Sequence, residues 1–77
     1  MNVMRRKRLD ATKTRLDEIC EELEYIKSEE EEVMENLPES LQDSERASNM
    51  QGAIDEIGSA ISSLEEASYY IELVINE

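Results

Sequence analysis

The sequence has no histidine, tryptophan or phenylalanine, and it contains one cysteine, one proline and two glycines. Without histidine, the chain lacks the usual general base of enzymes and the usual nitrogen ligand of metals. A single cysteine cannot form a disulfide within the chain, which favours a reducing, intracellular compartment. No apolar run exceeds three residues, so we expect neither a membrane span nor a signal peptide. These absences predict a cytoplasmic protein that is no enzyme and holds no cofactor or metal.

Acidic residues dominate the chain, with 20 Asp and Glu against 8 Lys and Arg in 77 residues. Six of the eight basic residues lie in the first fifteen positions beside one acid, which gives that segment a formal charge of +5. The remainder carries two basic residues against nineteen acids, a formal charge of −17. This acidity opposes direct binding to nucleic acid, which we do not expect. An alternative that stays open is that the acidic rod mimics DNA.

Two stretches carry apolar residues at the a and d positions of a heptad repeat, the pattern of a helix with one apolar stripe. In the second stretch, the a positions are Ala47, Ile54, Ile61 and Ile75, and the d positions are Met50, Ile57, Leu64 and Ile71. In the first stretch, the a positions are Leu9, Leu16, Leu23 and Leu37, and the d positions are Ile19, Ile26 and Val33. Each stretch is therefore predicted to form a helix.

The two stripes are mirror images about Ser40. Antiparallel pairing about this residue gives seven layers: Leu9 with Ile71, Thr12 with Ser68, Leu16 with Leu64, Ile19 with Ile61, Leu23 with Ile57, Ile26 with Ile54, and Val33 with Ala47. Even Thr12 and Ser68, two polar residues on the stripes, meet each other in this register, whereas Glu30 at an a position lies opposite Met50. The sequence therefore predicts an all-α fold, in which one domain over residues 1–77 forms an antiparallel two-helix hairpin that resembles a coiled coil.

Local signals predict where the two helices begin and end. Residues 1–8 are basic and add no apolar position to the stripe, so we expect them to fray and the first helix to span about 9–36. Pro38 ends this helix because it disfavours the helical conformation of the residue before it. Residues 37–43 form the connection. Asp43 or Ser44 then caps the second helix, expected over about 44–76.

The apolar face of the second helix is wider than a hairpin needs. Its g positions, beside the a and d columns, are the candidate dimer face of Ala53, Ala60, Ala67 and Val74. The g positions of the first helix are Arg8, Arg15, Glu22 and Glu29. Because small residues let another helix approach closely, this face predicts a homodimer or higher homo-oligomer, with two hairpins forming a four-helix bundle. Alternatively, the alanines serve only as strong helix formers.

A second candidate surface lies at the open end of the hairpin, where the antiparallel register brings residues 69–73 alongside residues 7–11. The candidate contact residues are Arg5, Arg6, Arg8, Tyr69, Tyr70 and Leu73. Amphipathic aromatic residues beside arginine are typical of interaction surfaces, so a partner or ligand is expected here. Alternatively, these aromatic residues pack against the N-terminal residues or against a dimer mate.

The connection reads N-L-P-E-S-L-Q-D-S-E-R over residues 36–46, with Met50 following. This segment resembles a loose group of small, acidic, uncharacterised proteins encoded by phages and prophages of Gram-positive bacteria. The likeness covers roughly residues 21–64, and Asp43 stands where many of these proteins have glycine. The resemblance carries no activity and no functional residues. It implies a phage gene product, and small acidic phage proteins often inhibit or sequester host machinery.

Together, these observations predict a non-enzymatic interaction protein that blocks a host factor, such as a defence component, by protein contact. Two rival functions belong to other classes. In one, the protein is a sponge for an anionic nucleotide, which the basic N-terminus and Tyr69 or Tyr70 enclose. In the other, it is a structural assembly factor. The sequence names no target, and it indicates no membrane association.

Overall fold

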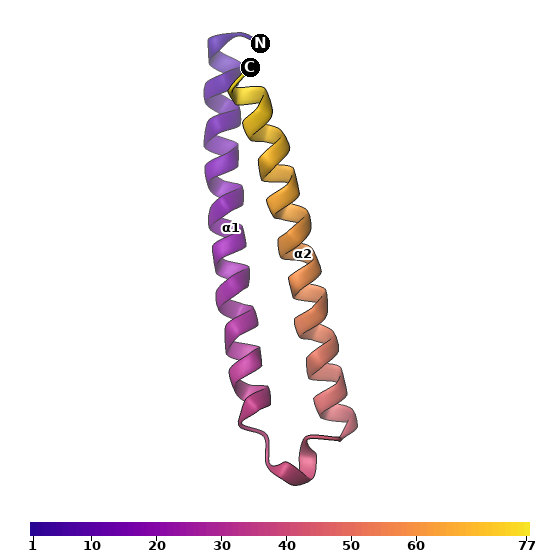
Figure 1. The fold of residues 1–77 in the computed structure, drawn as a ribbon. Coiled ribbons are helices and arrows are strands. Elements are labelled where there is room, and N and C mark those ends of the chain that lie inside the picture. The colour runs from indigo at the N-terminus through magenta and orange to yellow at the C-terminus, as the bar shows by residue number, and fades with distance from the viewer.

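The computed structural model describes residues 1–77 and consists of two long antiparallel helices (Figure 1). Helix α1 spans Val3–Glu35 and helix α2 spans Glu45–Ile75, and the short 3-10 helix η1 (Glu39–Leu41) lies in the connection between them. The hairpin is 59 Å long and 14 by 13 Å across, with both chain ends at the same end. The all-helical hairpin predicted from the sequence is confirmed. Neither helix contains a stretch that is both long enough and apolar enough to cross a membrane.

The first helix begins earlier than predicted, at Val3 instead of Leu9. The side chain of Asn2 accepts a hydrogen bond from the backbone N–H of Arg5 at 2.8 Å, which caps the new helix end. Arg6 then ties this first turn to the end of α2, because its Nη1 donates to the carbonyls of Ile75 and Glu77 at 2.9 and 2.8 Å. Helix α1 therefore includes residues 3–8, which were expected to lie before the first helix.

The connection follows the predicted signals closely. Helix α1 ends at Glu35, before Pro38, as the steric effect of proline requires. Ser44 caps α2 by accepting a hydrogen bond from the backbone N–H of Ala47 at 3.2 Å. Glu45 lies in the first turn of α2, where a negative charge is favourable beside the helix N-terminus.

Helix α2 buries the side that its heptads predict, but α1 is rotated about its axis. The buried residues of α2 are Ala47, Met50, Ile54, Ile61 and Ser68, at a and d positions. The half-buried residues of α1 all lie at a and e positions: Arg6, Leu9, Lys13, Leu16, Cys20, Leu23, Lys27, Glu30 and Met34. Its d residues Ile19, Ile26 and Val33 are 51%, 45% and 50% exposed. The three predicted layers that contain them are therefore not formed. The contacts of Ser68 with Asp17 and of Gly58 with Lys27 also lie about one helical turn away from the predicted register, which paired Ser68 with Thr12.

Contacts on the e side of α1 accompany this rotation. Gly58 lies beside the stem of Lys27, since a Cβ at Gly58 would make an ordinary van der Waals contact of 3.8 Å with Lys27 Cε. One heptad along, Glu65 lies within electrostatic range of Cys20. Lysine stems and cysteine thiols supply apolar surface although they do not count as apolar in a heptad pattern. The e column of α1 therefore packs where its d column was expected.

The antiparallel register can be tested by a disulfide. In the structure, Ser68 contacts Asp17 and Gly58 lies beside Lys27, which places Leu64 level with Cys20 and not with Leu16, the partner predicted from the sequence. With Leu64 changed to Cys, oxidation should give an intramolecular disulfide with Cys20, detected by mass spectrometry of the non-reduced protein. Cysteines at positions 16 and 64 in a Cys20→Ser background form the control pair. If the control pair crosslinks more readily than the pair at 20 and 64, the register of the structure is wrong.

Candidate functional site

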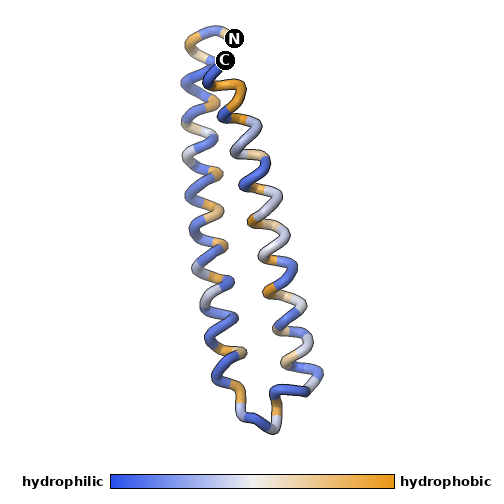
Figure 2. The backbone as a smooth tube through the Cα atoms, viewed as in Figure 1, coloured by the Kyte–Doolittle hydropathy of each residue, from blue (hydrophilic) through white to orange (hydrophobic).

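The rotation of α1 gives the hairpin two unlike long faces. In an antiparallel pair, the e positions of both helices flank one side of the seam and the g positions flank the other. The polar face, on the e side, consists of Lys13, Cys20 and Lys27 of α1 with Gly58, Glu65 and Glu72 of α2. The two helices also differ in hydropathy. Figure 2 shows isolated hydrophobic residues on a largely hydrophilic α1, whereas hydrophilic stretches make up less of α2.

The apolar face lies on the opposite side of the seam. It consists of Ile19, Ile26 and Val33 of α1 together with Ile57, Leu64, Ile71 and the candidate dimer column Ala53, Ala60, Ala67 and Val74 of α2. Ala53 and Ala60 are exposed, whereas Ala67 and Val74 are half-buried. Three large side chains of α1 thus lie beside the small residues of α2. Sequence reasoning found the alanine column but placed the three α1 residues inside the hairpin.

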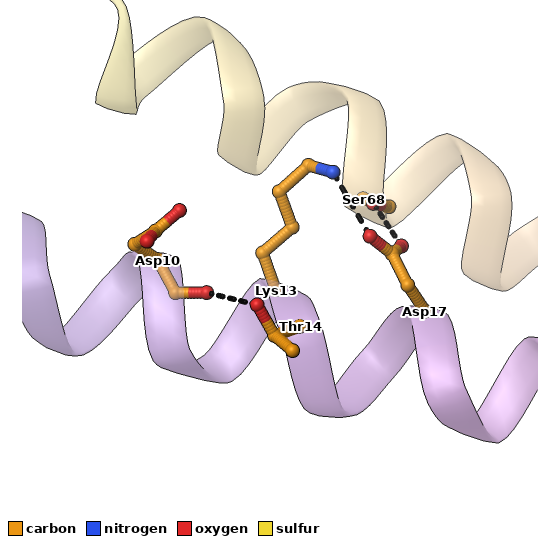
Figure 3. Close-up of polar contacts among 5 residues, drawn as sticks. All are labelled: Asp10, Lys13, Thr14, Asp17 and Ser68. Atoms are coloured by element: carbon orange, nitrogen blue, oxygen red, sulfur yellow. Dashed lines mark hydrogen bonds and ion pairs between the residues drawn. The ribbon is translucent and has the colours of Figure 1, made fainter.

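A polar cluster joins the two helices on the polar face (Figure 3). The Ser68 hydroxyl donates to Asp17 Oδ1 at 2.7 Å, and Lys13 Nζ donates to Asp17 Oδ2 at 3.0 Å. Thr12, the predicted partner of Ser68, instead donates to the backbone carbonyl of Arg8 at 2.8 Å. The hydrogen bond from Ser68 and then the one from Lys13 lower the pKa of Asp17.

Cys20 lies in a hollow of about 280 Å³ on the polar face, lined also by Asp17, Glu65, Ser68, Tyr69 and Glu72. Loss of hydration and then the nearby carboxylates, Glu65 foremost, raise the pKa of the Cys20 thiol. A raised pKa disfavours the thiolate, which is the nucleophilic form. The hollow therefore suits neither nucleophilic chemistry nor an anionic ligand. No three acidic, cysteine or histidine side chains converge to hold a metal ion.

The candidate arginines at the open end do not act together. Arg5 and Arg8 line a hollow of about 310 Å³ with Met1, Leu9 and Thr12. Arg6 is engaged with the carbonyls at the end of α2, where the helix dipole favours a cation. Tyr69, expected beside these arginines, lines the separate acidic hollow. The hairpin therefore does not bring arginine and Tyr69 around one shared pocket.

The open end instead carries exposed apolar side chains near both ends of the chain. Tyr69 and Tyr70 pack edge to face with ring centroids 5.6 Å apart, and both are more than half exposed, as are three residues that sequence reasoning missed. The open-end patch consists of Met1, Val3, Met4, Tyr69, Tyr70 and Leu73. The missed residues belong to the early start of α1, and the asparagine cap at position 2 was the signal that could have located them.

Comparison with known proteins finds no family model that matches this chain, and no similar curated protein or solved structure. The protein is therefore described by its own geometry, as an acidic helical hairpin with one polar and one apolar long face.

The hydrogen bond between Ser68 and Asp17 can be tested by titration. Because the pKa of Asp17 is lowered, its contribution to stability is present above about pH 4 and is lost as the pH falls through the lowered pKa. Ser68→Ala should raise the pKa of Asp17 toward its ordinary value, as measured by NMR of the carboxyl carbon. The protein should then lose less stability as the pH falls through the pKa of Asp17. Ser62→Ala, on the exposed side of α2, is the control. An unchanged Asp17 titration in Ser68→Ala would contradict the contact.

Proposed function

We propose that this protein is a non-enzymatic interaction protein, which pairs through its apolar face into a four-helix bundle and contacts a target protein through its open-end patch. The observation that carries the proposal is the separation of its exposed apolar side chains into these two surfaces. Of the eleven large apolar side chains that are exposed, three lie on the apolar face and six form the open-end patch. The remaining surface is largely charged, so these two areas stand apart from it.

The exposed area supports pairing of two hairpins. The chain exposes 5930 Å², and only 5 of its 77 residues are buried. A compact monomer of 8.9 kDa is expected to expose roughly 4,800 Å². The excess, about 1,100 Å², is larger than the roughly 800 Å² that each partner contributes to a standard protein interface. An elongated two-helix hairpin therefore has enough uncovered surface to form one.

The open-end patch has the composition of a protein contact site. It combines two tyrosines and two methionines with Val3 and Leu73, and exposed arginines Arg5 and Arg8 lie at the same end. Aromatic residues, methionine and arginine are enriched at protein interfaces. The resemblance of residues 21–64 to small acidic phage proteins points to a host factor, such as a defence component, as the target. Binding at this patch would block or sequester that factor.

A nucleotide ligand is less well supported than a protein target. Phosphates need several cations that are free to approach them, but Arg6 is held by the end of α2. The hollow that Tyr69 lines contains Asp17, Glu65 and Glu72, which repel an anion. Acidic DNA mimicry and a role in assembly rest only on the overall charge and shape.

Capture of the target tests the open-end patch directly. The protein should be immobilised through biotin on a Ser40→Cys, Cys20→Ser variant, because position 40 lies in the connection, away from the patch. From a bacterial lysate, a target identified by mass spectrometry should bind this protein but not its Tyr69→Ser, Tyr70→Ser, Leu73→Ser variant. Each lost hot-spot side chain is expected to cost about 1–2 kcal/mol of binding energy.

Two controls decide the outcome of this experiment. Tyr25→Ser removes a 67% exposed tyrosine in the middle of α1 and should leave capture unchanged. Calorimetry with cyclic dinucleotides and trinucleotides tests the rival ligand, with an Arg5→Ser, Arg8→Ser variant that spares Arg6. Equal capture by the patch variant would contradict the patch. Submicromolar nucleotide binding that this arginine variant loses would overturn the protein target.

A further inference from the structure

The charged column beside the apolar face changes sign halfway along α1. Its residues are Arg8, Arg15, Glu22 and Glu29, all exposed and spaced by one heptad. The two ion pairs of the hairpin, Lys13 with Asp17 and Lys27 with Glu31, involve none of them. Arg15 makes only a long hydrogen bond to the Thr12 hydroxyl, at 3.3 Å. The column thus carries two positive and two negative charges that lack ionic partners within the hairpin.

We infer that a second copy of this chain covers the apolar face in one particular orientation, with the two α1 helices antiparallel to each other and the two α2 helices likewise. The inference rests on the pairing proposed above and adds its geometry. In this orientation, Arg8 meets Glu29 of the second copy, and Arg15 meets Glu22 of the second copy. Two-fold symmetry repeats both pairs, so all four charges of each column are matched.

Only one register matches every charge. Sliding the second copy by one heptad in one direction brings Arg15 against its own equivalent, and sliding it in the other direction brings Glu22 against its own equivalent. The matched register places the two-fold axis between Glu18 and Ile19, near the middle of Val3–Glu35. The two hairpins therefore overlap along almost their full length.

The other face-to-face arrangement leaves the charges unmatched. If the two-fold axis ran along the length of the hairpin, α1 would pack against α2 of the second copy. The charged column would then face Ala53, Ala60, Ala67 and Val74, none of which carries a charge. Complementary charges at the edge of an interface fix orientation and exclude wrong partners more than they add affinity. They therefore favour the arrangement with like helices adjacent.

Charge reversal tests the orientation. Variant one, Arg8→Glu with Arg15→Glu, has an all-acidic column, and variant two, Glu22→Arg with Glu29→Arg, has an all-basic one. Each alone should dimerise about tenfold more weakly than the wild type, or worse, because every flanking pair is like-charged. Their equimolar mixture should form heterodimers almost exclusively, as measured by native mass spectrometry. All four positions are exposed, so circular dichroism should show that each variant keeps its helices in the mixture.

A matched control separates this pairing from simple attraction between differently charged chains. Glu21→Arg with Glu35→Arg gives the net charge of variant two but places the new arginines on the outward side of α1. Mixed with variant one, it should not form heterodimers preferentially. In a Cys20→Ser background, Ile19→Cys lies near the proposed axis and should give a disulfide-linked dimer.

The outcomes distinguish this inference from the proposed function. A wild-type chain that stays monomeric at high micromolar concentration would remove the four-helix bundle itself. A wild-type dimer that ignores the charge reversals, and whose Ile19→Cys form does not crosslink, would keep the bundle but overturn the antiparallel orientation. Selective heterodimers together with the crosslink would support both.

Discussion

The side of α1 that packs against α2 determines what the rest of the molecule exposes. Lys27 lies over Gly58, and Ser68 of α2 binds Asp17 of α1, so α1 turns its a and e positions toward α2. Its d column, with Ile26 at the centre, is left half exposed beside the alanines of α2. With α1 turned this way, the hairpin has a polar face and an apolar face.

The heptads of α2, the stop at Pro38 and the antiparallel pairing could be predicted from the sequence, because each depends on a local pattern with a strong physical cause. The rotation of α1 could not. It depends on Cys20 and on lysine stems, whose apolar surface a binary pattern ignores, and on Gly58, whose effect exists only once the helices are paired. The early start of α1 depends on a single asparagine cap, which the basic composition of the segment concealed.

The candidate contact residues were identified only in part, for a similar reason. The antiparallel register placed Tyr69, Tyr70 and three arginines at one end, and the structure keeps them in the first turns of α1 and the last turns of α2. Composition does not predict that Arg6 binds the end of α2 or that Tyr69 lines an acidic hollow. Both contacts depend on the rotation of the helices and on the direction of the side chains. The open end is therefore better suited to contact with an apolar protein surface than to enclosure of phosphates.

We propose that the face opened by the rotation of α1 closes against a second copy lying alongside it. Light scattering combined with small-angle X-ray scattering on the same sample tests this pairing. We expect twice the chain mass of 8.9 kDa and a maximum dimension still close to the 59 Å of one hairpin. A mass of one chain would contradict it, and so would a doubled mass with a doubled length, because end-to-end association leaves the apolar face uncovered.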